Sequence, residues 1–198
     1  MKEENQKIEK RENKSVILVK FENNENFENN GFKEINPEIK GKKELKKVME
    51  TMGIWFYIME SEFYDTVTVE MDEKPLTVIK QFRQTPTTAI KRIIPLDSVV
   101  SSASDELITT ILELASVKIN KEESFTLRLS SNGSKLRGIK FPEKITSRIC
   151  AELCNGLKLQ YHDNLRYHDE NTNWIIQIEE LGENKGISIC RPDEILMK

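Results

Sequence analysis

Positively charged side chains gather between positions 128 and 148. This stretch holds six cations and one acid, so its local net charge is +5, whereas the rest of the chain carries a net charge of −8. The cations are Arg128, Lys135, Arg137, Lys140, Lys144 and Arg148. Cations on a loop and at the start of a helix suit phosphate oxygens, so the stretch is a candidate nucleic-acid contact. The alternative is an ordinary solvated face.

A further cation, Arg92, lies in the sequence KRIIP, beside apolar residues that we expect to be buried. Its guanidinium could clamp a nucleic-acid backbone. It could equally form a domain-linking ion pair with Asp97 or another acid. The sequence leaves both roles open.

Cysteines and histidines raise the question of a metal site. Cys150 and Cys154 are one helical turn apart, whereas structural zinc sites place a cysteine pair on a tight hairpin, with a longer gap before the histidines. We expect both to be core or boundary residues and expect no metal. His162 and His168 belong to the tandem sequence YHDNLR–YHDENT. That stretch could bind a metal or stack on bases, or it could be a polar connection whose tyrosines fold onto the core.

The sequence shows no catalytic signature. It has no Walker loop, no Gly-x-Gly-x-x-Gly, no nucleophile elbow and no cysteine in a recognisable catalytic context. Acids are plentiful, but nothing marks a pair as general acid and base. We therefore expect a protein that is not an enzyme and needs no cofactor.

Composition limits the class of protein. The chain has 198 residues, 37% of them hydrophobic and 32% charged, which suits one or two small, well-solvated domains. Three cysteines, an odd number, argue against a disulfide framework and suit a reducing compartment. The longest apolar run, residues 54–59, is too short to cross a membrane, and the charged N-terminus is not a secretory signal. We expect a soluble, cytoplasmic protein.

The helices and strands that position these residues are expected to form two domains, one in each half of the chain. Residues 1–14 are expected to be a disordered tail and 22–41 a long polar loop. In the first half, strands are expected at 15–21, 54–60, 64–71 and 89–96, and helices at 42–52 and 74–84. This β-α-β-β-α-β order is the ferredoxin-like arrangement, with two helices on one face of a four-stranded antiparallel sheet.

The second half begins near Asp97 and reads α-β-α-β-β after a linker. Its first helix, 104–116, is expected to be capped by Ser104. Its first strand, 124–130, alternates so that Thr126 and Arg128 are expected to point outward from a half-buried strand. A second helix is expected from Pro142 to the breakers Asn155 and Gly156, followed by a hairpin of strands 173–181 and 185–190.

This second half resembles the THUMP domain, an RNA-binding module of tRNA-modifying proteins. The resemblance rests on four fragments in the family's order, which together span residues 91–190: KRIIPLDSVV, SFTLRLSSNGSKLRG, EKITSRICAELCNGL and NWIIQIEELGENKGISI. One loop departs from the family's pattern of Arg-Arg-Gly or Lys-Arg-Gly, because this chain has Ser131, Asn132 and Gly133 there. Charge resumes at Lys135 and Arg137, so RNA contacts could be weaker or displaced along the loop.

The resemblance implies an α+β chain with a ferredoxin-like domain over 15–96 and a THUMP-like domain over 97–198. In the family THUMP is usually fused to a thiouridine synthetase, methyltransferase, pseudouridine synthase or deaminase. Because the sequence ends eight residues after Cys190, it is similar to the stand-alone type that binds tRNA beside a separate cytidine acetyltransferase. The implied partners are tRNA and that enzyme.

Two other functions stay open at this point. The chain could be an enzyme with an unrecognised site, and the residues that could form it are His162, His168, Asp163 and Asp169. It could also be a protein-only interaction module, which Asn132 in place of a cation makes conceivable.

Overall fold

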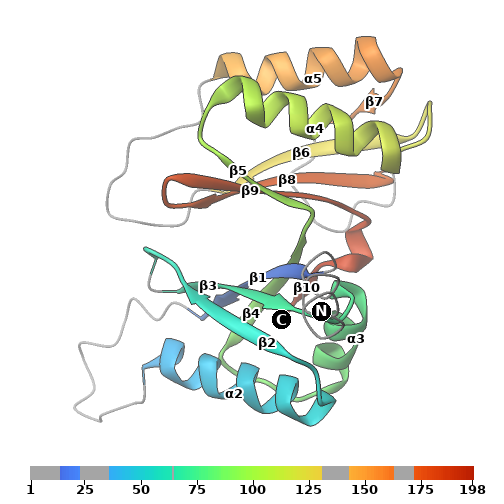
Figure 1. Ribbon diagram of the computed structural model, residues 1–198. Helices are drawn as coiled ribbons and strands as arrows, with labels where there is room; N and C mark the ends of the chain where they lie inside the picture. The colour runs from blue at the N-terminus through green and yellow to red at the C-terminus, as the bar shows by residue number, and fades with distance from the viewer. Residues whose placement is uncertain (1–13, 23–35, 64, 131–142, 163–171) are drawn as a thin grey trace, which may run out of the picture. The chain divides into compact units, whose positions relative to one another are not determined.

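The computed structural model describes residues 14–22, 36–63, 65–130, 143–162 and 172–198 (Figure 1). The chain forms two compact units. The first contains residues up to Pro95 together with Leu196–Lys198, and the second contains Leu96–Ile195. The predicted domains, 15–96 and 97–198, differ from these units chiefly at the C-terminal end, where the last three residues belong with the first unit.

The first unit has the predicted β-α-β-β-α-β order. Its strands form one sheet in the order β10-β4-β1-β3-β2, and β1 and β2 each pair antiparallel with β3. Its elements are β1 (Ser15–Phe21), α2 (Pro37–Met52), β2 (Phe56–Glu60), β3 (Thr66–Met71), α3 (Pro75–Gln84), β4 (Ile90–Leu96) and β10 (Leu196–Met197). The neighbouring strands β4, β1, β3 and β2, together with the two helices, confirm the ferredoxin-like prediction. Apolar side chains from α2, α3 and the facing side of the sheet form the first core.

Helix α2 begins earlier than predicted, at Pro37 rather than at 42. The Asn36 side chain caps it by accepting a hydrogen bond from the Glu38 N–H at 2.9 Å, and Pro37 suits the first turn. Gly41, which suggested a loop, is instead a helical residue packed against Phe21. A Cβ there would lie 2.2 Å from a ring carbon of Phe21, so only glycine fits. Gly53 ends the helix in the left-handed conformation, which glycine adopts without strain.

The second unit is a mixed sheet with two helices on one face (Figure 1). The strand order is β5-β9-β8-β6-β7, in which β6 is parallel to β7 and β8, while β9 is antiparallel to β8 and β5. Its elements are β5 (Ser98–Ser101), α4 (Ser104–Lys118), β6 (Ser124–Ser130), α5 (Glu143–Leu157), β7 (Gln160–Tyr161), β8 (Trp174–Leu181), β9 (Asn184–Cys190) and the 3-10 turn η1 (Pro192–Glu194). This confirms the α+β class and the predicted α-β-α-β-β core.

Two predictions about helix ends in this unit are wrong, and one strand was not predicted. Ala103 occupies the cap position of α4, and Ser104 is the first helical residue. Helix α5 continues through Gly156 to Leu157, and Lys158 takes the left-handed conformation after it. The region expected to be a linker contains β5, which exists because it pairs with the distant β9. Local sequence does not reveal a four-residue strand whose partner lies far along the chain.

The prediction that β6 is half-buried is also wrong. Phe125 and Leu127 belong to the second core, but Thr126 and Arg128 on the other face are buried as well. Arg128 lies opposite Gln177 of β8, which is itself fully buried. The alternation of residue types correctly separated an apolar from a polar face of the strand, yet a polar face is not necessarily exposed to water.

In the described part of the chain, no helix is long and apolar enough to span a membrane.

Candidate nucleic-acid interface

Two of the predicted RNA-binding cations are exposed on α5. Lys144 and Arg148 lie one turn apart on the side of the helix opposite Ile149 and Leu153, which are fully buried. The 3.6-residue period of α5 therefore keeps its cations in solvent and its apolar residues in the second core. Their role in binding RNA stays a prediction.

Arg148 is engaged in a cross-helix ion pair. Its Nη1 lies 2.9 Å from Oδ1 of Asp105, near the start of α4, and the side chains are 56% and 87% exposed respectively. Ion pairs this exposed contribute little to stability, because water and salt screen them. A phosphate could replace the Asp105 carboxylate at small cost, so the pair is compatible with an RNA contact.

Arg128 does not share this exposed surface. It is 7% exposed in β6, where the sequence predicted an outward-pointing cation. The expectation that Arg128 points outward from a half-buried strand is therefore wrong, and its role in binding RNA stays a prediction.

Arg92 is half-buried in β4 of the first unit. It lies opposite Met197 of β10 in the sheet register. Asp97, the acid considered as its partner, binds the Lys118 ammonium at 2.5 Å and accepts the Ile189 N–H at 2.7 Å within the second unit.

The remaining predicted cations, Lys135, Arg137 and Lys140, lie outside the described residues, as does the altered loop Ser131–Gly133. The same is true of Asp163, His168 and Asp169.

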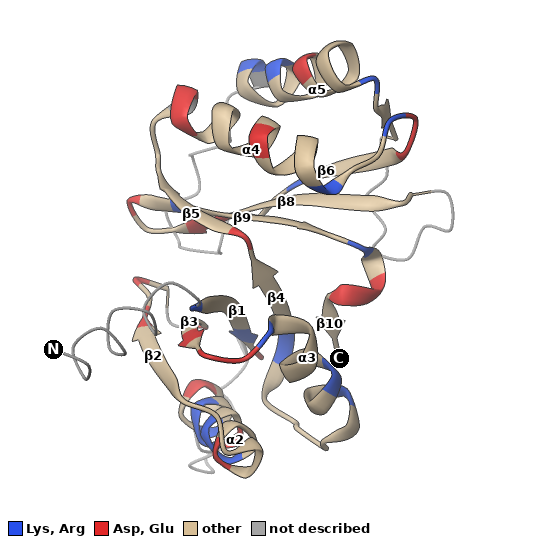
Figure 2. Ribbon diagram, turned by 45° about the vertical axis from the view of Figure 1, so that its right-hand side comes forward, with Lys and Arg blue, Asp and Glu red and all other residues tan. Residues whose placement is uncertain are grey.

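The structure reveals cations that the sequence analysis overlooked. Helix α2 carries five lysines within eight residues, in the sequence KGKKELKK (40–47), and Figure 2 shows basic residues along this helix. The signal was present in the sequence. The apolar spacing of Leu45, Val48 and Met49 indicates the helix, and the same spacing places the lysines on its opposite face.

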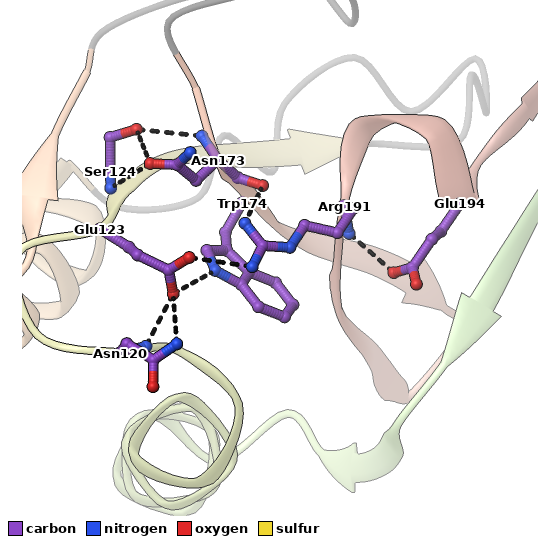
Figure 3. Close-up of polar contacts among 7 residues, drawn as sticks. All are labelled: Asn120, Glu123, Ser124, Asn173, Trp174, Arg191 and Glu194. Carbon is purple, nitrogen blue, oxygen red and sulfur yellow. Dashed lines mark hydrogen bonds and ion pairs between the residues drawn. The ribbon is translucent and has the colours of Figure 1, made fainter.

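A cluster of polar side chains lies at one end of the second sheet (Figure 3). Its carboxylate and guanidinium are groups that could take part in catalysis, but here they bind one another. The Glu123 carboxylate accepts hydrogen bonds from Trp174 Nε1 at 3.0 Å and Asn120 N at 2.8 Å, and pairs with Arg191 at 2.9 Å. The Arg191 guanidinium lies 4.0 Å above the Trp174 ring. The Trp174 hydrogen bond, assisted by Asn120 and Arg191, lowers the pKa of Glu123 to about 2.

This cluster joins the starts of β6 and β8 to the residue that follows β9. Ser124 and Asn173 extend it, since the Ser124 N–H and hydroxyl both donate to the Asn173 side-chain oxygen. A carboxylate that already accepts four hydrogen bonds is poorly suited to abstract a proton. We interpret the cluster as a structural network that stabilises the ends of these strands.

The cysteines lie where core residues are expected. Cys150 and Cys154 of α5 pack against the second core, and Cys190 of β9 is buried. Burial raises the pKa of the Cys190 thiol to about 12, so the thiol stays protonated and unreactive. Among the described residues, no group of three or more histidines, cysteines and acids is placed to hold a metal ion.

The fold is shared with solved structures. PH1313 from Pyrococcus horikoshii OT3 superposes with a TM-score of 0.65 at 12% identity, over 92% of this chain and 55% of that protein. A 4-thiouridine synthetase in complex with RNA, with bound ATP, superposes with a TM-score of 0.56 at 13% identity, over 89% of this chain and 41% of that one. The fold is THUMP-like.

The likeness concerns the fold, because the identities are low. A possible methylase from Clostridium difficile 630 gives a TM-score of 0.50 at 16% identity over 89% of this chain. The chain spans about half the length of PH1313 and 41% of the synthetase and of the possible methylase. No family model matches the sequence, and no curated protein matches it.

Proposed function

We propose that this THUMP-like chain binds tRNA and, without catalysing a reaction itself, presents it to a separate modifying enzyme. One observation supports RNA binding above all. The fold of 89% of the chain is shared with a 4-thiouridine synthetase whose structure contains RNA. The resemblance of residues 91–190 to the THUMP domain agrees with this.

The exposed cations suit an RNA backbone rather than base edges. Lys144 and Arg148 present ammonium and guanidinium groups from one helix face, and such groups form charge-assisted hydrogen bonds with phosphate oxygens. The deep major groove of A-form RNA hides the base edges, so recognition of a tRNA stem depends mainly on shape and backbone. In this proposal the protein contributes proximity, because it holds a nucleotide near a partner's active site.

The resemblance also supports a more specific proposal. The partner would be a cytidine acetyltransferase, the RNA contact would be near the acceptor-stem end of tRNA, and the protein would act in the cytoplasm. Co-purification with tagged protein, followed by RNA sequencing and mass spectrometry, identifies both the tRNA and the partner enzyme.

Filter binding tests the RNA-binding part of the proposal. We expect the protein to bind tRNA in preference to duplex DNA, with an affinity that falls steeply between roughly 50 and 200 mM salt, because neutralised phosphates release counterions. Affinity that is flat over this range, or equal for DNA, would contradict a phosphate-dominated tRNA contact.

A second assay separates the adaptor from an enzyme. The purified protein is incubated with tRNA and small-molecule group donors, and the nucleosides are analysed by mass spectrometry. We expect modification only when the co-purifying enzyme is added. Modification by the protein alone would establish the enzymatic alternative.

A further inference from the structure

Four lysines form an exposed stripe along α2 in the first unit. Each of them is exposed, while Leu45, Val48 and Met49 on the opposite side of the helix are buried in the first core. At 100° per residue the stripe occupies an arc of about 120°, in which Glu50 is the one exposed acid. The members of this lysine stripe are Lys40, Lys43, Lys46 and Lys47.

The other two acids of α2, Glu38 and Glu44, bind groups outside the lysine stripe. Glu38 pairs with Lys42 at 2.6 Å, and Lys42 also binds Glu60 of β2. Glu44 accepts hydrogen bonds from the N–H groups of Thr88 and Ala89, both at 3.0 Å. Among the described residues no ion pair involves a stripe lysine, and Glu50 is the one acid set against the four positive charges in the arc.

A groove adjoins the stripe at Lys47. It has a volume of about 300 Å³ and lies between the C-terminal half of α2 and the end of α3. Its polar lining combines the Lys47 side chain with hydroxyl and amide groups; the lining residues are Glu44, Lys47, Val48, Thr51, Gln81, Thr85, Pro86 and Thr87. The volume is at the lower end of the range for small-ligand pockets, enough for a sugar–phosphate segment.

A second cation, Lys198, binds two of the residues that line the groove. The Lys198 ammonium donates hydrogen bonds to the Thr85 carbonyl oxygen at 2.9 Å and to the Thr87 hydroxyl at 2.6 Å. Glu44 is the acid in the lining, and both its oxygens already accept backbone hydrogen bonds. These hydrogen bonds hold the Glu44 carboxylate against the backbone of Thr88 and Ala89, and the cations that attract an anion to the groove are Lys47 and Lys198.

We propose that the lysine stripe of α2 and its adjoining groove form an RNA-backbone site in the first unit, additional to the cations of the THUMP-like unit. The inference rests on the proposed function and deepens it by naming where a second set of phosphates binds. Ammonium groups on flexible stems act as point charges that follow a phosphodiester backbone without reading sequence. Consecutive phosphates bind the stripe, and a sugar–phosphate segment enters the groove beside Lys47.

The test replaces all four stripe lysines by glutamine in the full-length protein. We expect tRNA affinity to fall about tenfold or more near 100 mM salt. The slope of log affinity against log salt should fall by nearly one for each lysine that contacts a phosphate. The stripe is exposed, so circular dichroism and the melting temperature should remain those of the parent.

The matched control changes the same amount of charge elsewhere. It replaces four other exposed lysines by glutamine: Lys74, Lys80, Lys91 and Lys121. We expect less than a threefold loss of affinity, because only a diffuse charge effect remains. Equal losses in the two variants would overturn the stripe as a site, and an unchanged stripe variant would do so too.

Two further measurements locate the contact directly. Acylation of lysine ε-amino groups, read by mass spectrometry, should be suppressed by tRNA at the stripe and unaffected at Lys74 and Lys80. A Thr51→Trp variant, which fills the groove from an exposed position, should weaken tRNA binding severalfold. If the Thr51→Trp variant binds tRNA as well as the parent, the groove is not part of the site. If an acidic protein, but not tRNA, suppresses acylation of the stripe lysines, the stripe binds a protein partner instead.

These outcomes are distinct from a failure of the proposed function. If the parent protein does not bind tRNA at all, the proposed function fails. If the parent binds tRNA with a steep salt dependence and the stripe variant matches the control, only the further inference fails.

Discussion

The Glu123 carboxylate connects three segments that are distant in the sequence. It binds Asn120 just after α4, Trp174 at the start of β8 and Arg191 after β9 (Figure 3). Charge-assisted hydrogen bonds of this kind are stronger than neutral ones, and here they fix strand ends that would otherwise fray. The cluster thus contributes to stability rather than to chemistry.

Replacement of Glu123 by glutamine should make the stability of the second unit less dependent on acid pH. The pKa of Glu123 is about 2 in the folded protein against 4.5 for the unperturbed group, so the unfolded state binds the proton first as pH falls. The stabilisation is therefore complete above about pH 4.5 and lost as pH falls toward 2. With partial solvent screening we expect Glu123→Gln to cost about 1–2 kcal/mol at pH 7 and much less near pH 2.

Urea denaturation of parent and variant across this pH range measures the difference. Glu152→Gln, at an exposed position of α5, is the control and should shift stability by no more than about 0.5 kcal/mol. A gap between parent and Glu123→Gln that stayed constant from pH 7 to pH 2 would show that the carboxylate charge does not stabilise the cluster.

At the scale of elements, two helical glycines illustrate how tertiary packing overrides propensity. Gly41 and Gly156 both lie inside helices, where alanine is intrinsically better by about 1 kcal/mol. A Cβ on Gly41 would lie 2.2 Å from a ring carbon of Phe21, whereas a Cβ on Gly156 would meet none of the described residues within 4 Å. The same substitution should therefore have opposite effects at the two sites.

We expect Gly41→Ala to destabilise the first unit by about 1–3 kcal/mol, because the Phe21 ring must move within a packed core. Gly156→Ala should stabilise the second unit by about 0.5–1 kcal/mol. Thermal denaturation of the two variants provides the measurement. A stabilised Gly41→Ala protein would mean that Phe21 does not occupy the space beside α2.

At the scale of the whole molecule, the chain crosses between its two units twice. After η1 it returns to the first unit, where β10 pairs antiparallel with β4 and Leu196 enters the first core. Residues that follow the THUMP-like unit in sequence thus complete the ferredoxin-like sheet. The stability of the first unit depends on a segment remote from it in sequence.

Replacement of Leu196 by alanine should therefore destabilise the first unit. Leu196 is 3% exposed, and the loss of its buried methyl groups should cost about 2–3 kcal/mol. Hydrogen exchange should accelerate in β1 and β4 while β8 keeps its protection. Ile187→Ala, at a fully buried position in the second core, is the control and should show the reverse pattern.

The sequence by itself determined the order of the helices and the longer strands, and the class of fold. The short β-branched run at 15–21 and the alternation at 124–130 place β1 and β6 at their observed bounds, because strand formation depends on patterns within a few residues. The 3.6-residue period of α5 likewise separates the exposed Lys144 and Arg148 from the buried Ile149. Helix α2 shows that even an exposed lysine stripe is legible in sequence once the helix phase is known.

Only the tertiary structure decided what depends on distant partners. The pairing of β5 with β9 and the return of β10 to β4 arise from contacts between segments far apart in the chain, and the burial of Arg128 on the second face of β6 does not follow from the local pattern either. The pKa of Glu123 and the need for glycine at position 41 have the same origin. Local periodicity specifies an element and its two faces, but the neighbours that cover each face are set when the whole chain packs.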